Sequence, residues 1–296
     1  MRSRKRRRDL MWGLVFTSPA IIGLLWFTAY PVLASLYYSF TSYTMVGPPK
    51  WIGWANYADL LTDQVWWSSL WNTVYIVVWS VPLGIVAALG LALLLNMGVG
   101  GRSVYRTVFY LPTIVPAVAS AVLWMYIFDP QYGLLNDALA KVGVAGPGWL
   151  SDPGWAKPAL IVMSAWGVGN LMVIMLAGLQ EVPATLQEQA STDGAGVLSR
   201  FRHVTLPYVS PHMLFALVTG LIGGFQFFTP VFVMTGGTGN PAGSTLVSGL
   251  YLYQNAFQYF KVGYASAIAW MLFALVAAIT VATFRLVGRR VYYGGR

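Results

Sequence analysis

Six long runs of apolar residues dominate this chain of 296 residues. A helix needs about 20 mostly apolar residues to cross the hydrocarbon core of a bilayer, and each run is long enough. From the second run to the fifth, none contains Asp, Glu, Lys or Arg. The pattern therefore predicts an all-α integral membrane protein with six transmembrane helices, at residues 12–38, 72–95, 108–128, 158–180, 209–230 and 264–286.

The basic residues predict how these helices are oriented. One side of the membrane would receive residues 1–11, 96–107, 181–208 and the C-terminal end from Arg285 onward, which carry 14 of the 18 Lys and Arg residues. The other side receives only Lys50, Lys141, Lys157 and Lys261. With the acidic residues included, the two sides carry net charges of +10 and −1. The positive-inside rule then places both termini in the cytoplasm, in agreement with an even number of spans.

Composition excludes an ordinary soluble domain. The chain is 57% hydrophobic and 9% charged, whereas soluble domains carry about 25% charged residues. The basic run at residues 2–8 resembles a signal-peptide start, but the apolar run to Ser39 is too long for one and favours an uncleaved anchor. We therefore expect a cytoplasmic N-terminus (1–11), a six-span membrane domain (12–286) and a cytoplasmic tail (287–296), with outer loops near 39–71, 129–157 and 231–263.

Several kinds of chemistry are missing from the sequence. None of the five lysines follows a glycine, so the phosphate-binding loop of an ATPase is absent. The two histidines, His203 and His212, lack the spacing of a metal-dependent hydrolase, and the absence of cysteine excludes a thiolate site. The predicted spans also lack the titratable groups that proton-coupled transport needs. We expect neither an enzyme nor a metal site.

One predicted cytoplasmic loop, residues 181–208, has a pattern of its own. Pro183 suits the first turn of a helix over 184–191. Asp193-Gly194 predicts a turn, and a second amphipathic stretch over 195–204 would end at Leu206-Pro207, before the fifth span. From the residues alone, this helix–turn–helix fits an interfacial hairpin as well as a docking element.

The loop also carries a resemblance to a known family. Glu188-Gln189-Ala190-Ser191-Thr192-Asp193-Gly194-Ala195, followed by Phe201, Leu206-Pro207 and Pro211, resembles the E-A-A-x-x-D-G-A…F…L-P…P loop (the EAA motif) of binding-protein-dependent ABC importer permeases. Gln189 departs from the usual alanine. Further similarities lie at residues 53–57, 72–73, 102–106, 129–136, 235–237 and 263–267, and they are typical of the carbohydrate-uptake branch, first permease subunit of the maltose and glycerol-phosphate type.

The resemblance implies a fold and a set of partners. It implies a type I ABC importer permease fold in a bacterial or archaeal inner membrane. A second permease subunit, two ATP-binding subunits and an extracytoplasmic sugar-binding protein would complete the transporter. The chain itself would hold no cofactor, because the ATPase subunits bind ATP and Mg.

The same resemblance implies site residues. The loop would dock on the ATPase as a coupling helix, through Glu188, Ala190, Asp193, Gly194, Ala195, Phe201, Leu206 and Pro207. The sugar would meet positions in the fourth and fifth spans, namely Gly167, Asn170, Phe225 and Gln226. The neighbouring Trp166 fits helix packing as well as substrate contact.

Two other functions lack the residues that they need. A lone channel would need rings of charge in a pore, and the sequence pattern shows none. A membrane enzyme would need a set of catalytic residues, and the sequence offers none. Within the importers, the alternative cargo is glycerol-3-phosphate or another polyol derivative. A phosphate would require Arg or Lys in the pathway, and no predicted span interior contains one.

Overall fold

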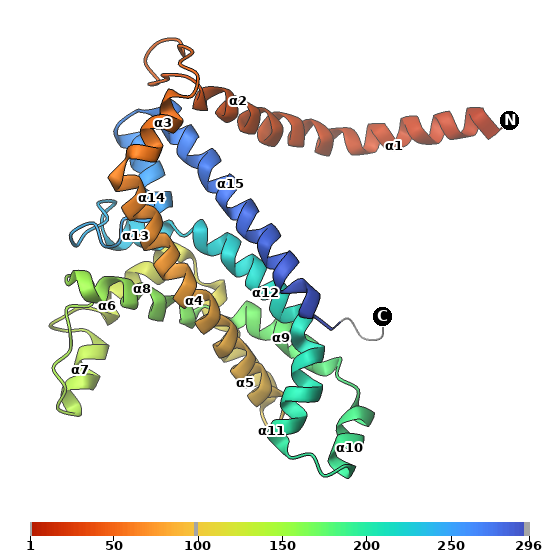
Figure 1. Cartoon of the computed structure of the whole chain (residues 1–296). Coiled ribbons are helices and arrows are strands. Elements are labelled where there is room, and N and C mark those ends of the chain that lie inside the picture. The colour runs from red at the N-terminus through yellow and green to blue at the C-terminus, as the bar shows by residue number, and fades with distance from the viewer. Residues whose placement is uncertain (1, 98–99, 293–296) are drawn as a thin grey trace. The chain divides into compact units, whose positions relative to one another are not determined.

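A computed structural model describes the backbone of residues 2–97 and 100–292, and the side chains of residues 10–97, 100–289 and 291–292. Most of the described residues are helical (Figure 1). They form two compact units, residues 2–63 with 252–271 and residues 64–97 and 100–251 with 272–292.

The first unit contains a long, nearly continuous N-terminal helix. It comprises α1 (Arg2–Leu24), a π-helical turn η1 (Leu25–Ala29) and α2 (Tyr30–Ser39), followed by α3 (Ala55–Thr62). The π-helical η4 (Gln254–Gln258) and the start of α15 (Val262–Leu286) complete the unit. Asn56 ties the chain together by donating to the carbonyl oxygens of Ser39 at 2.8 Å and Thr41 at 2.9 Å.

The second unit is built around one long helix. This helix, α4 (Gln64–Asn96), packs against α8 (Pro153–Trp166), α9 (Gly169–Gln180) and α12 (Leu206–Phe225) (Figure 1). Ala88 and Ala92 of α4 are fully buried among Met172 and Met175 of α9. Small residues at such a contact let two helices approach closely, which is how helices associate in a membrane.

The remaining helices of the second unit are shorter. In chain order they are α5 (Arg102–Tyr110), the 3-10 turn η2 (Leu111–Ile114), α6 (Ala117–Ile127), α7 (Leu134–Lys141), α10 (Ala184–Thr192), α11 (Val197–Arg200), the π-helical η3 (Phe201–Thr205), α13 (Thr229–Met234), α14 (Ser248–Tyr253) and the 3-10 turn η5 (Gly288–Arg290). The last residues of α14 belong to the first unit. A second core cluster lies where α6, α8 and α13 meet, around Trp124, Phe128 and Leu160.

Four helices of the described residues are long and apolar enough to cross a membrane: 10–39, 64–96, 197–234 and 262–286. Two further pairs meet the test only when each is taken as one bent span. The pair 102–114 with 117–127 bends by 101°, and the pair 153–166 with 169–180 bends by 51°. Counting each bent pair as one span gives the six predicted spans, of which the third and fourth are bent.

Proline and glycine cause these bends. Pro116 precedes α6 with an extended backbone, and a proline ring cannot continue the preceding helix because it lacks an N–H donor. Gly167 and Val168 separate α8 from α9. Helix α8 also begins at Pro153, five residues before the predicted span, because Asp152 caps it by accepting a 2.8 Å hydrogen bond from the Gly154 N–H.

Candidate coupling loop and transport pathway

The predicted coupling loop, residues 181–208, forms a helical hairpin between α9 and α12. Helix α10 spans Ala184–Thr192, one residue longer than predicted, and Pro183 caps its start. The helix ends in a Schellman motif, in which the Ala195 N–H donates to the Ala190 carbonyl at 2.9 Å and the Gly194 N–H to that of Ser191 at 3.1 Å. Gly194 has φ +81°. The predicted turn is confirmed, and glycine suits it because other residues rarely adopt this conformation.

The second half of the loop differs from the prediction. Leu206-Pro207 does not end the helix, because α11, η3 and α12 run on continuously from Val197 to Phe225. The Leu206 N–H donates to the Phe201 carbonyl, which is the longer π-type step. This wider turn lies directly before Pro207, whose missing N–H would leave an α-helical turn incomplete.

Side chains of the coupling loop divide by exposure. Glu188, Asp193 and Gly194 are exposed, on one end of the hairpin. The other predicted loop residues are half-buried: Ala190, Ala195, Phe201, Leu206 and Pro207. Glu188 and Asp193 are therefore available for a charged contact with a partner.

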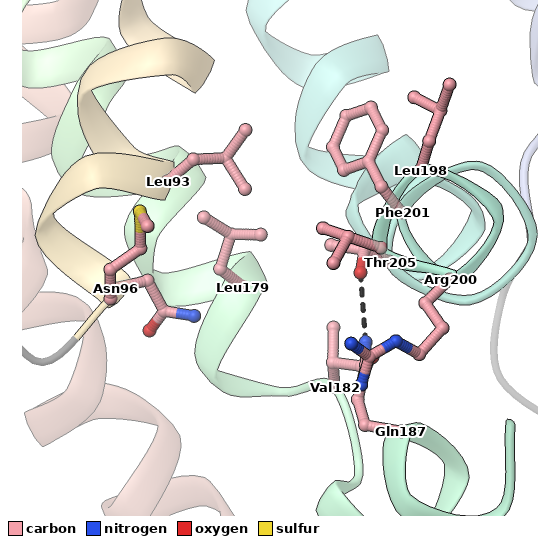
Figure 2. Close-up of a pocket in the computed structure, with 11 residues that line it drawn as sticks. Leu93, Asn96, Leu179, Val182, Gln187, Leu198, Arg200, Phe201 and Thr205 are labelled. Atoms are coloured by element: carbon pink, nitrogen blue, oxygen red, sulfur yellow. Dashed lines mark hydrogen bonds between the residues drawn. The ribbon is translucent and has the colours of Figure 1, made fainter. Parts of the chain in front are cut away.

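One contact in the hairpin escaped the sequence analysis. Gln187 Nε2 of α10 donates to Thr205 Oγ1 of η3 at 2.9 Å, joining the two arms of the hairpin (Figure 2). Beside this bond lies an open cavity of about 860 Å³. Its wall combines Leu93 and Asn96 of α4 with Leu179 of α9 and Phe201 of η3 (Figure 2). Residues of the hairpin and of the ends of α4 and α9 therefore line the same cavity.

A second cavity, of about 310 Å³, lies between α4, α8, α9 and α12. Two of the four predicted substrate residues, Gly167 and Asn170, line it. Its other polar side chains are Ser80 and Ser164, its aromatic one is Phe227, and none of its lining residues is charged. The cavity therefore offers hydrogen bonds and an aromatic surface without a full charge.

The other two predicted substrate residues lie where α12 ends. Phe225 is only 5% exposed and packs inside the protein. Gln226 is exposed, not buried as expected for a residue in mid-span, because α12 stops at Phe225 and α13 begins only at Thr229. Trp166 contacts Trp124 edge-on with ring centroids 6.1 Å apart, and it packs against the cluster around Phe128. The packing interpretation of Trp166 thus fits its position.

Motif residues between α6 and α8 act as structural ties. Asn136 donates to the carbonyls of Pro130 and Pro147, both at 3.2 Å, and accepts from Trp149 Nε1 at 2.7 Å. Asp129 Oδ1 accepts from the backbone N–H groups of the following turn. These residues shape the segment between α6 and α8.

Comparison with known proteins agrees with this architecture. Residues 80–293 match the family model described as "Binding-protein-dependent transport system inner membrane component". The chain is 42% identical to the probable ABC transporter permease protein YesP of Bacillus subtilis over 295 residues, covering 99% of this chain and 95% of YesP. It is 36% identical to the lactose transport system permease protein LacF of Rhizobium radiobacter over 288 residues, covering 95% of each.

A solved structure shares the fold. The crystal structure of a bacterial ABC transporter involved in the import of the acidic polysaccharide alginate matches 98% of this chain and 99% of its own, with a TM-score of 0.82 and 23% sequence identity. Fold and helical hairpin thus define a multi-pass permease of the ABC importer type. The chain belongs to the family of inner-membrane components of binding-protein-dependent transport systems. It is a transport subunit that works with a binding protein and further ABC transporter components.

Proposed function

We propose that this permease carries a sugar across the inner membrane. The observation that carries the proposal is the cavity between α4, α8, α9 and α12, where Ser80, Ser164, Asn170 and Phe227 form a neutral polar and aromatic wall. Ligand sites of this kind use a few placed polar groups on an otherwise apolar surface, which suits sugar hydroxyls and C–H faces. The similarity to the lactose permease LacF supports the same cargo class.

The assembly follows from the same family membership. A second permease subunit would pair with this chain, two ATP-binding subunits would bind ATP and Mg, and a binding protein would deliver the sugar from outside. The coupling loop would dock on one ATP-binding subunit through its exposed end, with Glu188 as a charged contact and Gly194 as the turn. Closure of the ATPase would then move α10 and, through the cavity wall, the ends of α4 and α9.

Orientation of the chain gives a first prediction. The division of basic residues places both termini, with residues 1–11 and 287–296, in the cytoplasm. Since the chain has no cysteine, single cysteines report cleanly. A cysteine at Lys141 should react with an impermeant maleimide from outside intact cells, and one at Ser199 should react only after permeabilisation. Both positions are exposed, so the reverse pattern would overturn the orientation.

A second prediction concerns Gln226. Gln226→Leu should lower sugar uptake by up to roughly tenfold, the worth of one hydrogen bond to an uncharged group, while complex stability stays unchanged. Transport of radiolabelled sugar and the melting temperature of the detergent complex measure the two effects. Gln131→Leu, at an exposed position of an outer turn, is the matched control. An equal loss for every sugar with a lowered melting temperature would instead make Gln226 a structural residue.

The alternative cargo, glycerol-3-phosphate or another polyol derivative, needs a cation for its phosphate. None of the residues lining the cavity is charged. Neutral polar groups in its wall suit sugar hydroxyls, so a phosphate would have to be bound outside this cavity.

A further inference from the structure

Lys157 occupies a position that the sequence pattern did not predict. It lies on α8 and is half-buried, rather than in an exposed outer loop. Its Nζ donates a 3.0 Å hydrogen bond to Asn72 Oδ1 of α4 and lies 5.1 Å from the centre of the Tyr75 ring. The ammonium group is thus held between two helices of the same unit.

This cation has no negative partner among the described residues. The close acid–base approaches there are Lys141 with Asp137 and His212 with Glu181, and neither involves Lys157. A lysine ammonium can donate three hydrogen bonds, and one is used here. Lys157 is only half-buried, so its other two N–H donors can bind water or an anion.

Asn72 is held in place to receive the ammonium. Its Nδ2 donates to the carbonyl oxygens of Gly243 at 2.9 Å and Leu246 at 3.1 Å, which directs its Oδ1 to Lys157. The next residue, Thr73, bonds to the Ser248 hydroxyl at 3.1 Å and accepts from the Ser248 N–H at 2.8 Å. The arrangement is rigid before any ligand arrives.

Helix register relates this cluster to the cavity of about 310 Å³. On α4, Asn72 lies one turn from Ile76 and two turns from Ser80, and both of these line the cavity. On α8, Lys157 lies two turns from Ser164, which also lines it, at a rise of about 10 Å. The cation is therefore in line with the cavity, beyond one of its ends. In the proposed orientation this is the outer end, from which a sugar arrives.

We propose that Lys157, positioned by Asn72 and Tyr75, is an anion subsite that recognises the carboxylate or sulfonate of an acidic sugar as it enters the pathway. The inference rests on the proposed sugar transport and names the class of sugar. The neutral cavity would bind the hydroxyls, and Lys157 would supply the missing countercharge at the entrance.

The test uses the complete transporter with its binding protein in proteoliposomes, supplied with a mixture of digalacturonate and neutral galactobiose. Uptake is measured by mass spectrometry for the wild type, Lys157→Gln, Lys157→Arg and the control Lys141→Gln, whose lysine is exposed and paired with Asp137. We expect uptake of digalacturonate, a roughly ten- to hundredfold loss in Lys157→Gln, as for a hydrogen bond to a charged group, retention in Lys157→Arg, and no change in the control.

The outcomes separate the two proposals. If the wild type carries galactobiose and not digalacturonate, the anion subsite is wrong and sugar transport stands. If it carries neither, sugar transport is contradicted. An equal loss of both sugars in Lys157→Gln, together with a lower melting temperature, would make Lys157 a tie between α4 and α8 and overturn the inference. Unchanged uptake in Lys157→Gln would overturn it too.

Discussion

Replacing Gly194 with valine is expected to uncouple the ATPase from the permease. Gly194 has φ +81° at the end of α10, a conformation that costs other residues about 1–3 kcal/mol and a β-branched one the most. The Schellman bonds from Ala195 and Gly194 would be lost, and α10 would change direction. Stimulation of ATP hydrolysis by the loaded binding protein should fall by tenfold or more, while the permease still inserts in the membrane.

Gly196 provides a matched control two residues away. It has φ −66° and ψ 169°, an extended backbone that valine adopts readily, and a Cβ there would meet open space. A Cβ at Gly194 would also meet open space, so the two substitutions differ mainly in backbone conformation. Normal coupling in Gly194→Val, or equal loss in Gly196→Val, would contradict the role of the turn.

Gly169→Ala is expected to destabilise the second unit strongly. Gly169 lies at the bend between α8 and α9, where an added Cβ would be 2.6 Å from the Phe109 carbonyl oxygen and 2.8 Å from Tyr110 Cα. These are backbone atoms, so the end of α5 would have to move away from α9. Overpacking of this kind costs about 1–3 kcal/mol. The melting temperature of the purified complex should fall by several degrees.

Gly90→Ala on α4 serves as the comparison. A Cβ at Gly90 meets nothing within 4 Å, and alanine favours the helix more than glycine does. Its melting temperature should be equal or higher. If both variants were equally stable, the close approach of α9 to residues 109–110 would not matter for the fold.

The sequence alone predicted the features that depend on neighbouring residues. Apolar runs located the membrane helices because transfer into lipid depends on local composition. Pro183 and Asp193-Gly194 predicted the ends of α10, because capping and turn preferences act within a few residues. The motif of the coupling loop indicated the family, and the match of residues 80–293 to the family model confirmed it.

Tertiary structure decided the features that depend on residues far apart in the chain. Local proline and glycine bent two of the predicted spans, by 101° and 51°, whereas the folded structure placed the end of α12 just before Gln226. It also brought Lys157 to Asn72, 85 residues away. Hydropathy placed Lys157 outside the spans because a window of local residues cannot register a partner on another helix. Contacts between helices far apart in the chain, such as that of Lys157 with Asn72, are therefore outside what local sequence patterns predict.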